Sequence, residues 1–416
     1  MPRTHWPRLL SAALLLWLAL TPPVRAQPVT APPAEAARER TAFRTTDFSL
    51  ALLDRLWQQP GNLLVSPYSL YAALLMLSSG AGGESATALG RVLRTPATGN
   101  DLEAFAREAA RLTRPSSGSQ VAMAQSLWPA KQFTLRPDFR RTMASTFGAS
   151  ITPLDYAGDA EGAARRINAW VSERTRGRIT DLVTAEQFSS DMRLSLVSSL
   201  WFKGEWPVPF DTEATRTGPF HLEGGGTKAV PLMRRVDRLR LGTIPGGRIL
   251  EIPYRGQTWE TTDHSLLILL PDRHDGLTAL QRQLTSQRLE QVIEGMKDTQ
   301  VDLALPRFRM RARPDLMHTL ERMGLGSVFR PGADLSRISP DPGLILSSVM
   351  QEAMLRVDEN GTEAAAATLM AMPVLGLSED PLTPFHVDHP FLVMIRDQPS
   401  GTLLFVGRVM EPGDQP

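Results

Sequence analysis

The chain has 416 residues, of which 42% are hydrophobic and 21% are charged, and its formal net charge is +1. This composition predicts a globular protein with a sizeable core and excludes a disordered chain. No cluster of five or more Lys and Arg occurs, so nucleic-acid binding has no support. Cysteine is absent, and the core must therefore hold the fold without disulfides.

The N-terminus has the pattern of an export signal. Arg3 and Arg8 precede an apolar run over residues 9–20, and Val24-Arg25-Ala26 resembles a small-residue cleavage site. The run is short for a membrane span, which disfavours the alternative of a retained anchor. We therefore predict a signal peptide over residues 1–26 and an exported protein, either secreted to the extracellular space or periplasmic. Residues 27–43, rich in Pro and Ala, predict a flexible leader.

From residue 44 the sequence predicts one domain, 44–416, because it contains no repeat and no long Gly/Ser linker. An apolar stripe from Phe48 to Trp57 predicts the first helix. A short strand then leads into a second helix: Ser66 can cap it, Pro67 suits its first turn, and Gly80 ends it.

Helices and strands are then interleaved without a regular βαβ rhythm. Helical patterns cover residues 84–93, 101–113 and 160–175, with a further helix from 314 to 324, and strand patterns cover 121–128, 194–203, 266–270, 303–310, 345–357 and 390–409. This order predicts an α+β fold with largely antiparallel sheets.

The run from Glu359 to Thr368 joins a glycine to small side chains. In a strand, the face that starts at Thr362 and ends at Val374 carries no charge and could be buried, whereas Glu363 belongs to the opposite face. Four consecutive alanines favour a helix by propensity. The residues alone leave both structures open.

We found no sign of an enzyme or a metal site. The motifs of serine hydrolases, zinc proteases and P-loop proteins are absent. His386 and His389 flank Asp388, but in a strand a spacing of three places the two histidines on opposite faces. We therefore expect no catalytic residue, no metal and no cofactor, and keep an unrecognised enzyme as the weakest alternative.

Several motifs in a fixed order resemble the serpin family of serine protease inhibitors along residues 44 to 412. They are the strand and helix of 62–80, the segments 167–171 and 175–179, the strand 197–206, and the short motifs 305–308, 388–391 and 405–409. The chain is accordingly identified as an exported member of bacterial type. The resemblance implies three mainly antiparallel sheets, eight or nine helices and an exposed reactive-centre loop at about 359–384.

The resemblance also implies a mechanism of suicide inhibition. A target serine protease cleaves the loop, forms a covalent acyl-enzyme, and is trapped when the loop inserts into the main sheet as a new strand. The partner is thus a serine protease, and the inhibitor is expected to be a monomer. The alternative is a non-inhibitory serpin that acts as a binding protein or chaperone. Small residues after Gly361 favour an inhibitor.

The resemblance assigns roles to individual residues. The hinge comprises Glu359, Gly361, Thr362, Glu363, Ala364, Ala365, Ala366, Ala367 and Thr368. Counting fourteen residues on from Gly361 places the reactive bond between Leu375 and Gly376, with Leu377-Ser378 as runner-up and Met372 a distant third. A large apolar Leu375 suggests chymotrypsin-like, elastase-like or subtilisin-like targets.

Trp206 matches the tryptophan of the breach, where the loop first enters the sheet. Ser66, Ser69, Ser198 and Gln351 correspond to the shutter at the middle of the sheet. Here the chain departs from the family, because Ser198 replaces an asparagine and Gln351 replaces the histidine that it usually meets. A Ser/Gln pair can still hydrogen-bond, so we expect altered opening energetics.

Overall fold

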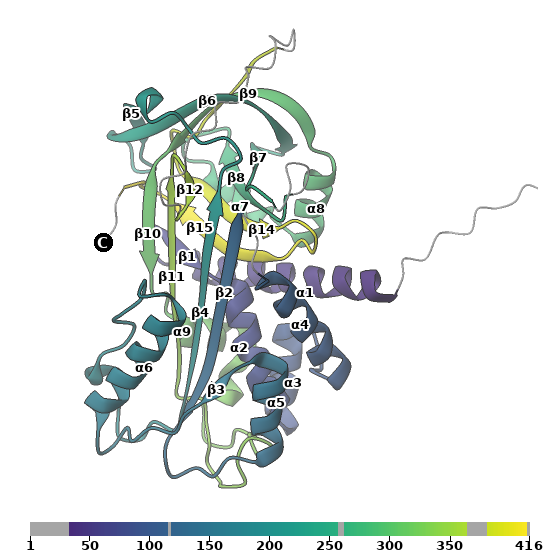
Figure 1. Ribbon diagram of the computed structural model, residues 1–416, viewed down its shortest axis with the longest axis vertical. Helices are drawn as coiled ribbons and strands as arrows, with labels where there is room; N and C mark the ends of the chain where they lie inside the picture. Colours follow the sequence, from purple (N-terminus) through teal and green to yellow (C-terminus); the bar gives the residue numbers. More distant parts are fainter. Residues whose placement is uncertain (1–32, 115–117, 257–261, 364–380, 414–416) are drawn as a thin grey trace, which may run out of the picture.

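The computed structural model describes residues 33–114, 118–256, 262–363 and 381–413 (Figure 1). Nine α-helices occur in these residues: α1 (Pro33–Leu56), α2 (Pro67–Ser79), α3 (Gly83–Leu93), α4 (Gly99–Leu112), α5 (Pro137–Phe147), α6 (Ala160–Arg174), α7 (Leu277–Arg282), α8 (Ser286–Glu294) and α9 (Leu316–Leu320). The number agrees with the eight or nine that we expected.

The first sheet has six strands, and its longest members run along the long axis of the molecule (Figure 1). Its order is β10 (Phe308–Ala312), β11 (Ser348–Asp358), β12 (Gly361–Thr362), β4 (Leu194–Glu205), β2 (Ser119–Pro129) and β3 (Ser150–Ile151). Most neighbours are antiparallel, but β11 and β4 also pair directly with each other, and that pairing is parallel.

The second sheet has nine strands and forms the upper part of the view in Figure 1. Its order is β1 (Leu63–Val65), β15 (Leu403–Val409), β14 (Phe391–Asp397), β8 (His264–Pro271), β7 (Gly247–Pro253), β6 (Thr227–Ile244), β9 (Lys297–Pro306) and β13 (Thr383–His386), and β5 (Arg216–His221) pairs with β6.

The described residues thus form two sheets where we expected three. The reason is the length of β6, which pairs with β5 over residues 227–232, with β9 over 232–241 and with β7 over 240–244. One continuous strand therefore joins two groups of strands into a single ladder. The α+β class and the predominance of antiparallel pairs are as predicted.

Helix α2 lies between the two sheets, in contact with β4 of one and β15 of the other. Its residues from Pro67 to Ser78 are all buried, as expected of a helix that is apolar all round. The predicted ends hold: Ser66 Oγ accepts a hydrogen bond from the backbone of Ser69, and the helix ends at Gly80. The helix thereby fixes the shutter serines at the centre of the core.

Helix α1 begins at Pro33, so part of the segment 27–43 that we expected to be a flexible leader is helical. Residues 34–40 consist of Ala, Glu and Arg, which have high helix propensity, and proline suits a first helical turn. The predicted signal peptide lies outside the described residues. Among the residues that the structure describes, no helix is long and apolar enough to cross a membrane.

Candidate functional site: the junction of β4, β11 and β12

The two central strands of the six-stranded sheet pair along only part of their length. β11 and β4 are paired in parallel from Ser348 to Glu352 on one strand and from Ser195 to Ser199 on the other. Further along both strands, Gly361 and Thr362 form β12, which is antiparallel to each neighbour: Thr362 pairs with Val357 of β11 and with Gly204 of β4. The first hinge residues therefore already form part of the sheet.

Gly361 permits this close approach. Its φ is +148°, in the region that favours glycine, and a Cβ atom built there would lie 2.0 Å from the carbonyl oxygen of Gly204. The next residue, Thr362, is 1% exposed, and its Oγ1 lies 2.6 Å from the hydroxyl of buried Tyr254. The face that begins at Thr362 thus points into the protein interior at this position.

Glu363 points to the other face of the sheet. Its backbone is in the left-handed region, with φ at 52°, and its N–H donates to the carbonyl oxygen of Arg356. Its carboxylate accepts a hydrogen bond from Trp201 Nε1 and lies 3.8 Å from Arg178 Nε. Burial raises the pKa of the Glu363 carboxyl, and the hydrogen bond from Trp201 and the nearby arginines offset part of that rise.

Trp206 holds the turn that precedes β12. Its indole N–H donates to the carbonyl oxygen of Asp358 at 2.9 Å, and its backbone N–H donates to that of Asn360. The indole ring stacks on Tyr254 with the ring centres 4.7 Å apart. Glu359 is buried too, and its carboxylate accepts from Thr215 Oγ1 at 2.9 Å. The predicted breach and hinge residues therefore lie together.

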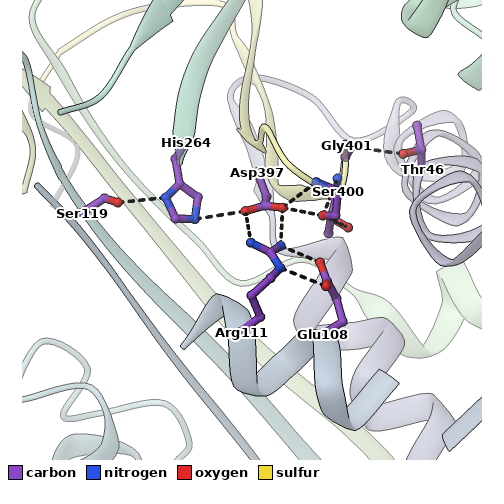
Figure 2. A network of polar contacts seen from close by, with 9 residues as sticks. Thr46, Glu108, Arg111, Ser119, His264, Asp397, Ser400 and Gly401 are labelled. Carbon is purple, nitrogen blue, oxygen red and sulfur yellow. Dashed lines mark hydrogen bonds and ion pairs between the residues drawn. The ribbon is translucent and has the colours of Figure 1, made fainter. Parts of the chain in front are cut away.

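An aromatic chain continues from this site into a buried polar network. Phe202 contacts both Tyr254 and His264, with ring centres 5.0 and 5.3 Å apart. His264 Nδ1 lies 2.8 Å from Ser119 Oγ, and its Nε2 lies 3.7 Å from Asp397 (Figure 2). Burial is the largest influence on the pKa of His264 and lowers it. The ring is therefore held neutral at neutral pH.

On its other side, the fully buried carboxylate of Asp397 binds Arg111 of α4, which also pairs with Glu108 (Figure 2). Both oxygens of the Asp397 carboxylate accept hydrogen bonds from the guanidinium. Because Ser119 begins β2 and Asp397 ends β14, this network ties the two sheets together beside the breach.

The residues predicted to form the shutter make a second buried hydrogen-bond cluster, centred on Gln351 of β11. Its Oε1 accepts from the backbone N–H of Ser66, and its Nε2 lies 3.0 Å from Ser66 O, 2.9 Å from Ser69 Oγ and 3.1 Å from Ser198 Oγ. All four side chains are at most 2% exposed. One amide therefore joins β11 to β4 and to the N-terminus of α2.

The structure brings the breach, shutter and first hinge residues onto one strip between β4 and β11. Ala364, Ala365, Ala366, Ala367 and Thr368, together with Met372, Leu375, Gly376, Leu377 and Ser378, lie outside the described residues. Sequence reasoning missed Tyr254, Trp201 and Arg178, which hold Thr362 and Glu363. They come from distant parts of the chain, and no local pattern in the sequence pointed to their meeting.

These features define an α+β protein in which Gly361 and Thr362 form a short antiparallel strand between two parallel strands of the six-stranded sheet. The family model described as "Serpin (serine protease inhibitor)" matches residues 44–412. The chain belongs to the serpin family.

Relatives and solved structures agree. The chain is 32% identical over 386 residues to leukocyte elastase inhibitor of Sus scrofa, covering 90% of this chain and 100% of the relative. It is 33% identical over 387 residues to the protein of the same name from Bos taurus, with the same coverage. The crystal structure of Serpin48 from the insect Tenebrio molitor has a TM-score of 0.80 and 26% identity, over 90% of this chain and 98% of that one.

Replacing Gln351 by Ala should destabilise the protein. The substitution leaves Ser66, Ser69 and Ser198 without their common partner, and each buried polar group that loses its partner costs about 1–3 kcal/mol. We expect the free energy of unfolding in urea to fall by at least about 2 kcal/mol. The control is Gln287→Ala on α8, where the side chain is exposed and the change should be within about 0.5 kcal/mol. Equal effects of the two substitutions would contradict the role of Gln351.

The pairing of residues 361–363 with β4 and β11, which we call docking of the hinge, should become more stable as the pH falls. The pKa of Glu363 is raised in the docked state above its usual value near 4.5, so that state binds the proton more tightly than a released hinge does. Between pH 7 and 5, hydrogen-exchange protection of residues 361–363, corrected for the intrinsic rate, should rise by at most about tenfold per pH unit.

Glu363→Gln should abolish this pH dependence while keeping an acceptor for Trp201. The matched control is Glu213→Gln, because Glu213 is exposed and near the same end of the sheet. It should behave as wild type. Protection that is flat or falls with acidification in wild type would refute the assignment.

Proposed function

We propose that this protein inhibits serine proteases as a suicide substrate, by inserting its cleaved reactive loop between β4 and β11. The observation that carries the proposal is that Gly361 and Thr362 already pair with both strands, in the antiparallel sense that an inserted loop would need. The names of the relatives, leukocyte elastase inhibitor, support the same function. The protein itself then acts as an inhibitor and not as an enzyme.

The register of β12 predicts the path of the rest of the loop. If it continues, residues 363–366 lie opposite positions where β4 and β11 have no direct pairing. Ala367 then reaches Ser199 and Glu352, the first directly paired residues, and Met372 reaches Leu194 at the start of β4. Twelve residues, 361–372, would fill the length of β4, about 40 Å at ~3.3 Å per residue.

The face that begins at Thr362 suits this path. Ala364 and Ala366 would lie beside Phe202 and Leu200, which are buried, so small side chains fit where large ones would clash. Thr368 would arrive between Ser198 and Gln351, whose hydrogen bond of 3.1 Å must break for insertion to continue. The Thr368 hydroxyl can replace a partner there. This supports the inference that the Ser/Gln shutter remains able to open.

The same register supports Leu375-Gly376 as the reactive bond. Leu375 would lie three residues past Met372, so cleavage after Leu375 frees enough chain to fill the whole of β4 and carries the attached protease past the end of the sheet. A large apolar residue suits chymotrypsin-like, elastase-like or subtilisin-like proteases. Leu377-Ser378 stays the runner-up, since two further residues would lengthen the inserted segment without changing its face.

Loop insertion has to release enough free energy to distort the protease and has to be faster than hydrolysis of the acyl-enzyme. A dozen new ladder bonds at about 1 kcal/mol each could offset the cost of distorting a bound protease. Insertion must also outrun hydrolysis of the acyl-enzyme, which for typical proteases means about 1–10³ s⁻¹. A hinge whose first two residues are already paired shortens that race, because only the remaining residues have to insert.

The setting of this activity also remains a proposal. The signal-peptide pattern of residues 1–26 supports export, to the extracellular space or periplasm, and a monomer without cofactor suffices for the mechanism. The two named relatives are mammalian, so a bacterial origin remains a prediction.

Thr362→Arg should convert the inhibitor into a substrate. Thr362 is 1% exposed and faces Tyr254, so a guanidinium at this position would have to be buried without a partner as the hinge docks. Wild type should form an SDS-stable complex with chymotrypsin or elastase, whereas the variant should be cleaved with little complex, so that the stoichiometry of inhibition rises at least about tenfold.

Glu213→Arg is the control, because Glu213 is exposed and a guanidinium at this position stays in solvent. It should retain a stoichiometry near that of wild type. An unchanged stoichiometry for Thr362→Arg would refute the burial argument. Cleavage of wild type without any complex would instead indicate a non-inhibitory serpin.

Cleavage by chymotrypsin or elastase should fall at Leu375-Gly376. Mass spectrometry of the released C-terminal fragment should give a peptide that begins at Gly376. Leu375→Arg should redirect inhibition toward trypsin-like proteases, while Leu377→Arg should leave the chymotrypsin reaction unchanged. A fragment that begins at Ser378, with the two variants reversed in effect, would move the reactive bond to the runner-up.

A further inference from the structure

Three histidines and an aspartate meet at one surface of the nine-stranded sheet, away from the breach. His221 ends β5, His274 follows β8, and Asp388 and His389 lie between β13 and β14. The ligand atoms of His274, Asp388 and His389 all lie within 4.8 Å of one another. Sequence spacing had argued against a metal site at His386 and His389. The structure pairs His386 with Asp302 instead and brings His274 to Asp388 and His389.

The hydrogen bonds of His389 orient its ring for a ligand. Its Nε2 lies 2.8 Å from the carbonyl oxygen of Pro271, which can only accept, so Nε2 carries a proton. Its Nδ1 lies 2.8 Å from the carboxylate of Asp388. When Nδ1 is protonated it donates to this carboxylate, and when it is not, its lone pair can bind a cation that the carboxylate also contacts. An imidazole that donates its second N–H to a backbone carbonyl is the usual state of a metal-bound histidine.

His274 supplies a third donor from the solvent side. It is exposed, its ring centre is 4.9 Å from that of His389, and its other face stacks on His221 at 4.2 Å. Because the side chain is exposed, its χ angles can adjust to bring a ring nitrogen toward Asp388.

The surroundings are suited to a cation. Asp388 is fixed, because its backbone carbonyl accepts from the N–H of His221 at 2.7 Å. The adjacent surface depression includes Glu223 and Asp272, while the one arginine that lines it, Arg273, is paired with Asp275 at 2.9 Å.

We propose that His274, Asp388 and His389 form a binding site for one divalent transition-metal ion, with Zn²⁺ as the best fit. Two imidazoles and one carboxylate are a ligand set that zinc accepts, leaving a position for water. Tetrahedral ligand atoms at about 2.0–2.1 Å from zinc lie about 3.3 Å apart. The His389 and Asp388 ligand atoms, now 2.8 Å apart, would therefore have to move slightly apart. The ring nitrogen of His274, which lies within 4.8 Å of both, would have to move closer.

Such an ion would fasten the segment that follows the reactive loop. β13 pairs only with β9, over four residues, among the strands that the structure describes, and Asp388 and His389 come directly after it. His274 belongs to the connection between β8 and α7. Bound metal would therefore tie the chain beyond β13 to the middle of the nine-stranded sheet, and would stabilise the folded form by mass action.

The test uses the untagged full-length chain, freed of metal by a chelator, and titrated with Zn²⁺ in competition with a chromophoric zinc chelator. We expect one zinc ion per chain and a rise in Tm that follows zinc concentration. His274→Ala and Asp388→Asn should each weaken binding by at least about tenfold and remove the rise in Tm. Both residues are at least partly exposed, so the variants should fold.

His386→Ala is the matched control, because His386 also lies beside a carboxylate, that of Asp302 at 3.0 Å, but has no third donor in the group. It should bind zinc as wild type does. Co²⁺ in place of Zn²⁺ should give visible absorption in wild type and in His386→Ala only. Lack of stoichiometric binding at 100-fold excess zinc, unchanged affinity in both ligand variants, or loss of binding in His386→Ala would each overturn the proposal.

Discussion

The parallel pairing of β11 with β4 is the constraint on which the rest of the structure depends. Two neighbouring strands that run in the same direction can both pair with one antiparallel strand between them, and β12 occupies this position over two residues. The direct pairing covers five positions and is reinforced at its middle by Gln351 and Ser198. β4 and β11 are thus paired directly at the middle of the sheet and are separated by β12 at one end. The proposed insertion would replace the hydrogen bonds of the direct pairing by hydrogen bonds to the inserted strand.

Side chains on both faces of the sheet contact the predicted hinge residues Thr362 and Glu363. Trp206 and Tyr254 form a rigid aromatic floor beneath Thr362, while Trp201 and Arg178 hold Glu363 on the opposite face. Beyond Phe202, the buried network of His264, Asp397 and Arg111 binds the two sheets to each other (Figure 2). A small number of side chains therefore holds residues 361–363 in position.

The proposed zinc site follows, along the chain, the segment that we propose as the reactive loop. The described residues stop at Glu363, directly after β12, and resume at residue 381, just before β13. Aromatic and polar contacts hold the residues up to Glu363, and β13 and the hydrogen bonds of His389 hold those from residue 381 on. Both anchors bring together residues that are far apart in sequence, which explains why neither was evident from local patterns.

Local patterns in the sequence determined the elements whose residues carry their own signals. The capped start of α2 at Ser66 and Pro67, the long apolar strands and the burial of Thr362 could be found because periodicity and capping act over a few residues. Motif order gave the family. Only the tertiary structure decided that β6 joins two sheets into one, that α1 starts at Pro33, and that β12 is already paired. Likewise, Tyr254 meets Thr362 and His274 meets His389 only through folding, because contacts across 100 or more residues leave no local signal.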